Sequence, residues 1–296
     1  MFGRGIFLIL SGLFKKAIIS DYISVNFVER IFDNPTLYSG LENLMGVYGY
    51  ALQIYCDFSG YSDMAIGIAL LLGFHFNLNF NSPYKSASIT EFWRRWHISL
   101  TTWFRDYIYI PLGGSRAGKW KSFRNTLVIF LVSGFWHGAN WTFVAWGAYH
   151  ALLFLPLLLL GQNRRYRDSV AENSFLPSVK ELTQMGATFL LVLLGWILFR
   201  SEDISQAAVY LERMFNVSLF SAPQLVGLGF GQLLLKKCFF FTALMFVVEW
   251  IGRKQAHGLM IEDLSLPVRY VIYTVLLIII YGFDASNPQG FIYFQF

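Results

Sequence analysis

Two histidines lie in stretches of apolar and aromatic residues, His97 in FWRRWHISL and His137 in SGFWHGANW. An imidazole has an unperturbed pKa of about 6.5, so it takes up and returns a proton near neutrality. Titratable groups are costly to keep at hydrocarbon depth, and a histidine there is a functional-site candidate by default. The tryptophans beside both histidines are able to shape a dry cleft. The first hypothesis is therefore general-base catalysis inside a membrane.

A second interpretation of these histidines stays open. A single histidine on an aromatic-rich helix is often a hydrogen-bonded packing residue, and this applies to His97 or His137 taken alone. Finding two of them favours a site. His150 in GAYHALL and His75 at the end of an apolar run are weaker candidates, and His257 in RKQAHGL has the setting of a loop residue.

Other polar patterns point less directly to chemistry. Asp57 and Asp63 in DFSGYSD are six residues apart and do not share one helical face, which favours polar packing or cavity groups over an acid/base pair. The turn in PLGGSRAG is able to receive phosphates through backbone N–H groups and Arg116, although a plain turn is the simpler interpretation. Cys56 and Cys238 lack metal-type spacing, so we expect packing residues without a disulfide, and no metal site. No cofactor is expected.

The composition predicts an all-α polytopic integral membrane protein. Of the 296 residues, 55% are hydrophobic and 19% aromatic, while only 14% are charged. Long apolar blocks recur without strict alternation of apolar and polar residues, which favours helices. The net charge of +5 reflects loop Lys and Arg side chains that set orientation and face anionic headgroups. The expected partner is therefore membrane lipid, and no nucleic acid.

Several apolar segments are candidate helices. The clearest span is 141–160, twenty residues without a formal charge. Segment 44–74 is interrupted by DFSGYSD and predicts two helices or one broken helix. Segment 6–23 is a weak span because Lys15 and Lys16 lie in its middle. Further strongly apolar segments are shorter: 125–136, 185–199, 233–248 and 268–283.

Two amphipathic segments predict interfacial or re-entrant helices. Segment 90–109 mixes tryptophan and tyrosine with charged residues, a pattern suited to a helix that lies at the headgroups or lines a polar cavity. Its start is marked by Ser88 or Thr90. Segment 203–215 predicts a second such helix with Asp203 as its N-cap.

Basic segments predict the orientation of the chain. If 125–136 and 141–160 form a hairpin, the basic segments on either side of it fall on the same side of the membrane. The connection at 137–140 then lies away from the cytoplasmic surface or deep in the membrane. Three segments rich in Lys or Arg are predicted to be cytoplasmic: 113–124, 164–167 and 253–254.

Four segments together resemble the membrane-bound O-acyltransferase (MBOAT) superfamily, and within it the bacterial alginate O-acetyltransferase type. They are YCDFSGYSDMAIGIALLLGF, FWRRWHISLTTWFRDYIYIPLGGSR, SGFWHGANWTFVAWGAYHA and FIYFQF. The resemblance covers nearly the whole chain and implies one MBOAT-like domain over 1–296. Members of that family usually carry several more spans before the segment resembling GLFKKAIISDYI. Because Met1 lies only a few residues upstream of it, the chain is expected to be N-terminally short.

The resemblance also implies an activity and a site. An acetyl group would pass from acetyl-CoA towards hydroxyls of an exported or cell-envelope polysaccharide, in the bacterial inner membrane. A separate periplasmic acetyltransferase often completes the delivery. The histidine of the WHG segment is catalytic in the family, which implies that His137 is the general base. The polar residue after FWxxW is His or Asn, which implies that His97 positions this base or assists the leaving thiolate. The predicted substrate contacts are Trp93, Trp136, Asn140 and, for the phosphates of CoA, Arg116.

Two alternatives to an enzyme stay open. In a proton-coupled carrier or flippase for an envelope polymer precursor, Asp57, Asp63, His97 and His137 would form a relay. A non-catalytic assembly subunit is the second alternative. The acyltransferase-like setting of both histidines favours the enzyme.

Overall fold

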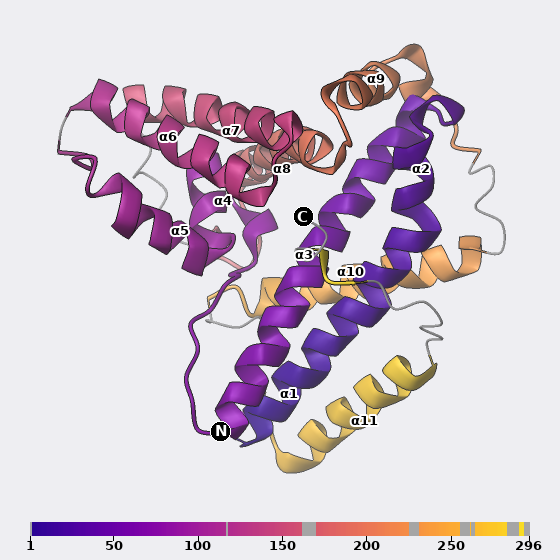
Figure 1. Ribbon diagram of the computed structural model, residues 1–296. Coiled ribbons are helices and arrows are strands. Elements are labelled where there is room, and N and C mark those ends of the chain that lie inside the picture. Colours follow the sequence, from indigo (N-terminus) through magenta and orange to yellow (C-terminus); the bar gives the residue numbers. More distant parts are fainter. Residues whose placement is uncertain are drawn as a thin grey trace. The chain divides into compact units, whose positions relative to one another are not determined.

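The computed structural model describes residues 2–116, 118–161, 170–224, 231–254, 261, 264–282 and 290–292. Throughout these residues the regular structure is helical and contains no strand (Figure 1), which confirms the all-α prediction. The chain divides into two compact units, Met1–Leu78 with Val209–Phe296, and Asn79–Ala208. The single MBOAT-like domain over 1–296 stays a prediction.

The longest helix of the first unit is α3 (Gly40–Leu71), which begins at a capping box. The Glu42 backbone N–H donates to the Ser39 hydroxyl, and the Ser39 N–H donates to the Glu42 carboxylate at 2.8 Å. The helix then runs through DFSGYSD without interruption. The break predicted inside 44–74 is therefore wrong.

Ion pairs explain why α3 continues through its two aspartates. The preceding stretch consists of α1 (Phe2–Leu13) and the π-helical turns η1 (Phe14–Asp21). Lys15 Nζ lies 2.9 Å from the Asp63 carboxylate, and Lys16 pairs with Asp57. Because lysines from another helix pair with both carboxylates, the aspartates stay inside the helix without a loop or a water-filled gap to solvate them.

Glycines fix the contact between α1 and α3. A Cβ at Gly60 would lie 2.6 Å from the carbonyl oxygen of Gly12, and one at Gly67 would lie 2.6 Å from that of Gly5. Only glycine permits so close an approach of two backbones, a device common where helices pack in membranes. The two glycine pairs therefore set the register of α1 along α3.

The remaining helices of the first unit agree with the apolar segments. Helices α10 (Gly231–Ile251) and α11 (Leu266–Gly282) contain most or all of the predicted 233–248 and 268–283. A short helix, α2 (Glu29–Asp33), precedes α3. Helix α9 (Ile204–Met214) begins in the second unit and ends in the first. It begins as predicted, because Asp203 Oδ1 accepts the Gln206 N–H at 2.7 Å. Cys56 is fully buried, as expected of a packing residue, and the side chain of Cys238 lies outside the described part.

The second unit contains the hairpin predicted from the apolar segments. Its first arm starts at Lys119, before the predicted 125, because Lys and Arg are good helix formers and extend it. Half of the basic segment 113–124 is thus helix and not loop. The two arms lie side by side (Figure 1), and the unit's helices are α4 (Ile89–Arg95), α5 (Ile98–Phe104), α6 (Lys119–His137), α7 (Trp141–Leu159) and α8 (Val179–Arg200).

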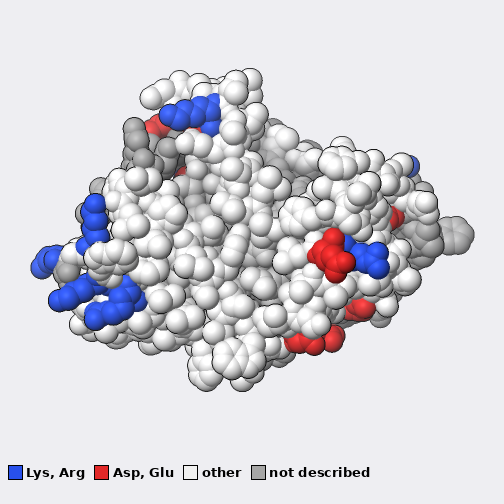
Figure 2. All heavy atoms as spheres, turned by 90° about the horizontal axis from the view of Figure 1, so that it is seen from above, with Lys and Arg blue, Asp and Glu red and all other residues white. Residues whose placement is uncertain are grey.

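Two of the described helices, α7 and α8, are long and apolar enough to cross a membrane. The helices predicted at 141–160 and around 185–199 are thus present, and their crossing of a membrane stays a prediction. Figure 2 shows wide areas without charged side chains on the face that it presents, and blue Lys and Arg side chains gathered near one edge. The basic residues 164–167, His257 and residues 293–296 lie outside the described residues, so the full topology stays a prediction.

Candidate active site

The predicted helix 90–109 is broken where the first candidate histidine lies. Ser88 caps α4, with its hydroxyl accepting the Glu91 N–H at 3.2 Å. Trp96 is extended, and His97 has a φ of +45°, in the left-handed region. A residue with a side chain costs about 1–2 kcal/mol there, and such strain is found where surrounding contacts enforce it. The chain therefore turns sharply at His97 before α5 begins.

Hydrogen bonds from a distant segment hold this turn. The Ile98 N–H donates to the Asn79 carbonyl at 2.9 Å, and the Asn81 N–H donates to the Arg95 carbonyl at 3.0 Å. The Arg95 guanidinium also pairs with the buried Glu91 carboxylate at 2.8 Å. The preceding extended segment thus clamps both sides of the turn and sets the direction of the imidazole.

The second histidine ends the first arm of the hairpin. His137 is the last residue of α6 and is 5% exposed. Its ring centroid lies 5.3 Å from that of Trp146 and 5.0 Å from that of Phe199. These aromatic rings come from α7 and α8, so three helices enclose the imidazole in an apolar wall.

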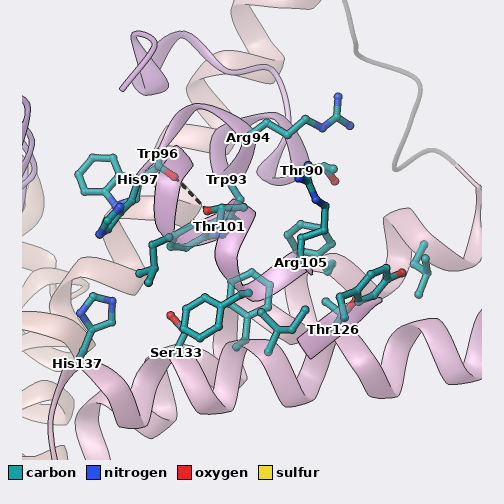
Figure 3. A pocket seen from close by; sticks show the side chains of 17 residues that line it. Thr90, Trp93, Arg94, Trp96, His97, Thr101, Arg105, Thr126, Ser133 and His137 are labelled. Carbon is teal, nitrogen blue, oxygen red and sulfur yellow. Dashed lines mark hydrogen bonds between the residues drawn. The ribbon is translucent and has the colours of Figure 1, made fainter. Parts of the chain in front are cut away.

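Both histidines line one cavity of about 720 Å³ within the second unit. This volume is typical of a small-molecule site. Figure 3 shows His97 and His137 on one side of the cavity, and Arg105 and Thr126 on the other. The walls are mostly aromatic and aliphatic, and Ser133 supplies a hydroxyl one turn before His137. The fold therefore brings together the two residues on which the catalytic hypothesis rests.

Burial keeps both imidazoles neutral. It lowers the pKa of His97 to about 4. It lowers the pKa of His137 to about 3, and the charge of a protonated His97 would act in the same direction. A neutral imidazole has a free lone pair at physiological pH, which is the form that a general base requires.

Of the four residues predicted to contact substrate, one lines the cavity and three lie outside its lining. Trp93 lines the cavity. Trp136 is 54% exposed, and its ring centroid lies 5.0 Å from that of His137 and 6.5 Å from that of His97. Asn140 caps α7 by accepting the Thr142 N–H at 3.0 Å and donates to the Glu202 carbonyl. Arg116 is exposed and is not among the lining residues.

Several cavity residues were not predicted from the sequence. Arg94 and Arg105 line the cavity, although the pattern around them predicts only the charged face of an amphipathic helix. Arg105 pairs with the neighbouring Asp106 at 2.7 Å, and both side chains are largely exposed. Thr101 and Ser133 also line it. Both were detectable, since each lies one helical turn from a candidate histidine.

Two apolar helices of membrane-spanning length beside a largely apolar cavity lined by two histidines are the features of a helical membrane protein with an internal site. Residues 18–175 match the profile of MBOAT, the membrane-bound O-acyltransferase family. The chain belongs to this family. It is 42% identical over 241 residues to the "Probable alginate O-acetylase AlgI" of Pseudomonas aeruginosa, covering 79% of this chain and 44% of the relative.

Two other relatives are named for different polymers. The chain is 40% identical over 214 residues to the peptidoglycan O-acetyltransferase of Helicobacter pylori, covering 72% of this chain and 39% of the relative. It is 31% identical over 210 residues to the teichoic acid D-alanyltransferase of Bacillus subtilis, covering 67% and 51%. The chain thus spans about half the length of the curated relatives that it matches.

Proposed function

We propose that this chain is part of a membrane O-acyltransferase that moves an acetyl group from acetyl-CoA to hydroxyls of an exported or envelope polysaccharide. The observation that carries the proposal is that one cavity is lined by both His97 and His137, each neutral at physiological pH. The names of the relatives support it, since they refer to alginate, peptidoglycan and teichoic acid.

His137 is the general base of this proposal. Its imidazole takes the proton from a sugar hydroxyl as the hydroxyl oxygen attacks the thioester carbonyl. The carbon–sulfur bond then breaks, and the thiolate receives the proton back from the imidazolium, so that an ester and a free thiol result. General-base assistance of this kind typically contributes about 10²–10⁴-fold. His97, on the same side of the cavity, orients the hydroxyl or assists the leaving sulfur (Figure 3).

The phosphates of acetyl-CoA are assigned to the side of the cavity opposite the two histidines. Arg94 and Arg105 line it there, and guanidinium groups bind phosphates through charge-assisted hydrogen bonds. Within the described part of the chain, Arg105 pairs with Asp106, and both side chains are largely exposed, so an arriving phosphate is able to replace this pair at small cost. Arg116 is exposed outside this lining, and its predicted contact with CoA stays a proposal to be tested beside Arg105.

The acceptor is assigned to the side of Trp136. Its exposed indole touches both imidazoles from outside the cavity lining, so a polymer hydroxyl arriving there would meet both histidines. Trp93 forms part of the cavity wall, and Asn140 keeps the hairpin connection in place. A periplasmic acetyltransferase is an alternative acceptor that would carry the acetyl group onwards to the polymer.

We place the protein in the bacterial inner membrane as a multi-pass protein. The two membrane-length helices α7 and α8 support this placement, as does membership of a membrane-bound family. Cysteines introduced at Ser115 and Ser174, which are both exposed in the described chain, test it by labelling from each side. We expect both to react from the cytoplasmic side, because they flank the hairpin.

A carrier is the alternative that shares these histidines. Its relay would use Asp57 and Asp63, but both are ion-paired with lysines in the first unit. The decisive experiment uses the full protein in lipid vesicles with labelled acetyl-CoA and polysaccharide acceptors. Esterified polymer and equimolar free CoA are expected. Movement of an unmodified polymer precursor without thiol release would favour the carrier.

A further inference from the structure

His150 is a buried histidine that the proposed mechanism does not use. It lies in the middle of α7 and is 0% exposed. Its Nδ1 accepts a hydrogen bond from Trp93 Nε1 at 3.3 Å, and the two rings meet edge to face with centroids 4.9 Å apart. Trp93 lines the cavity and His150 does not, so His150 contacts the cavity wall from the side that faces away from the cavity.

The hydrogen bond also defines the form of the imidazole. Because Nδ1 accepts, the neutral ring carries its proton on Nε2. Nε2 is buried and meets no partner among the residues that the structure describes. Helix α8 leaves it room by placing Gly195 opposite, where a Cβ would lie 2.6 Å from Nε2. A leucine at 150 would avoid the penalty of an unpaired buried donor, so packing alone does not explain a histidine here.

His150 is separated from the reacting groups by an indole. The ring of Trp146 has its centroid 5.2 Å from that of His150 and 5.3 Å from that of His137. Two rings that contact His150 line the cavity, those of Trp93 and Phe130. The N–H of Trp93 is a donor only, and the phenyl ring of Phe130 carries no exchangeable proton. Neither indole passes a proton at neutral pH, which argues against His150 as an acid or base for the substrate.

We propose that His150 is a positioning residue, which fixes the indole of Trp93 so that the cavity keeps the shape required for acyl transfer. The activity measurements below rest on the proposed function. The spectroscopic measurement does not rest on it, because it reports the hydrogen bond directly.

The test compares two replacements of His150, one that retains a hydrogen-bond acceptor for the Trp93 N–H and one that does not. Asparagine retains a hydrogen-bond acceptor near the position of Nδ1 but does not titrate, whereas leucine has a similar volume and no acceptor. We expect kcat/KM to fall about tenfold in His150→Leu and less than about threefold in His150→Asn, as for loss of one hydrogen bond. Trp93→Phe should resemble His150→Leu, and the double variant should be no worse than either single variant.

The independent readout is the indole N–H resonance of Trp93 in protein labelled with ¹⁵N-tryptophan. The resonance is assigned by its loss in Trp93→Phe. It should shift upfield in His150→Leu and stay near its original position in His150→Asn. If wild-type protein transfers no acetyl group, the proposed function fails while this measurement still decides whether His150 holds Trp93.

Gly195→Ala supplies a control for geometry. The added methyl group would press on Nε2 and should lower kcat/KM in the wild-type background. It should have little effect in His150→Asn, because asparagine has no atom in the place of Nε2. Two results would overturn the proposal: His150→Asn as inactive as His150→Leu with the indole resonance unchanged, or independent, multiplicative losses in the double variant.

Discussion

His97 directly precedes α5 and His137 ends α6, and the two imidazoles line one cavity although they belong to different parts of the chain. Neither helix would bring them together alone. The left-handed turn directs His97 towards the cavity, and the tight hairpin stops α6 where His137 faces the rings of Trp146 and Phe199. The first predictions follow from this pairing.

His137→Ala should lower kcat by about 10²–10⁴-fold, because the general base is lost while binding surfaces remain. The measurement is acetyl transfer by purified protein in vesicles, with protein level and thermal stability followed in parallel. His75→Ala is the matched control, since His75 is exposed and lies in the other unit. Near-normal turnover in His137→Ala would remove His137 from the catalytic step.

Variants at His97 distinguish the effect of its left-handed backbone conformation from the role of its imidazole ring. Asparagine tolerates the left-handed region, whereas valine is branched at Cβ and does not. We expect His97→Asn to retain part of the activity, His97→Ala less, and His97→Val to be destabilised as well. Thermal unfolding and kcat/KM should be measured together. Equal loss of activity in the asparagine and alanine variants would instead indicate proton transfer by His97.

The pH profile should extend further into acid than an ordinary histidine permits. Because burial lowers the pKa of His97 to about 4 and that of His137 to about 3, both stay neutral well below pH 6.5. Between these values and 6.5 the unfolded chain binds more protons than the folded one, so stability falls as pH falls through this window. We expect kcat/KM to hold down to about pH 5, checked by returning samples to pH 7. A midpoint near pH 6.5 would contradict the buried, neutral site.

Arg105→Gln should raise the KM for acetyl-CoA about tenfold or more and leave kcat nearly unchanged. The reason is that a phosphate contact is made equally in the ground and transition states. The salt dependence of KM should also weaken, since charge attraction to the donor is reduced. Lys180→Gln is the control, an exposed cation outside the cavity lining. If Arg116→Gln raises KM and Arg105→Gln does not, the phosphate site lies at the basic turn.

Asp63→Asn should destabilise the protein, by at most about 3–5 kcal/mol, because it removes the carboxylate 2.9 Å from Lys15 in a mostly buried place and leaves this lysine the Glu249 carboxylate 3.9 Å away. The exchange of both residues, Lys15→Asp with Asp63→Lys, should recover much of that stability. Thermal unfolding in detergent measures both. A stable Asp63→Asn protein that has lost its function would show that the carboxylate works chemically, as the carrier alternative requires.

The sequence by itself determined the helical class, the main apolar helices and both candidate histidines. These features are local: apolar stretches predict helices, a serine or aspartate before a helix predicts a cap, and a histidine among tryptophans is conspicuous. Ser88 and Asp203 cap helices as predicted, and α7 and α8 lie at predicted spans. The hairpin followed from two adjacent apolar segments.

Only the tertiary structure decided the features that depend on distant partners. Lysines from η1 keep α3 whole where its own residues predicted a break, because they neutralise Asp57 and Asp63. Asn79 and Asn81 enforce a turn at His97 that an isolated helix would not make. Arg105 and His150 acquire their places from the packing of helices around one cavity. Ion pairs, strained turns and cavity walls are made between segments far apart in the chain, so no local pattern of residues specifies them.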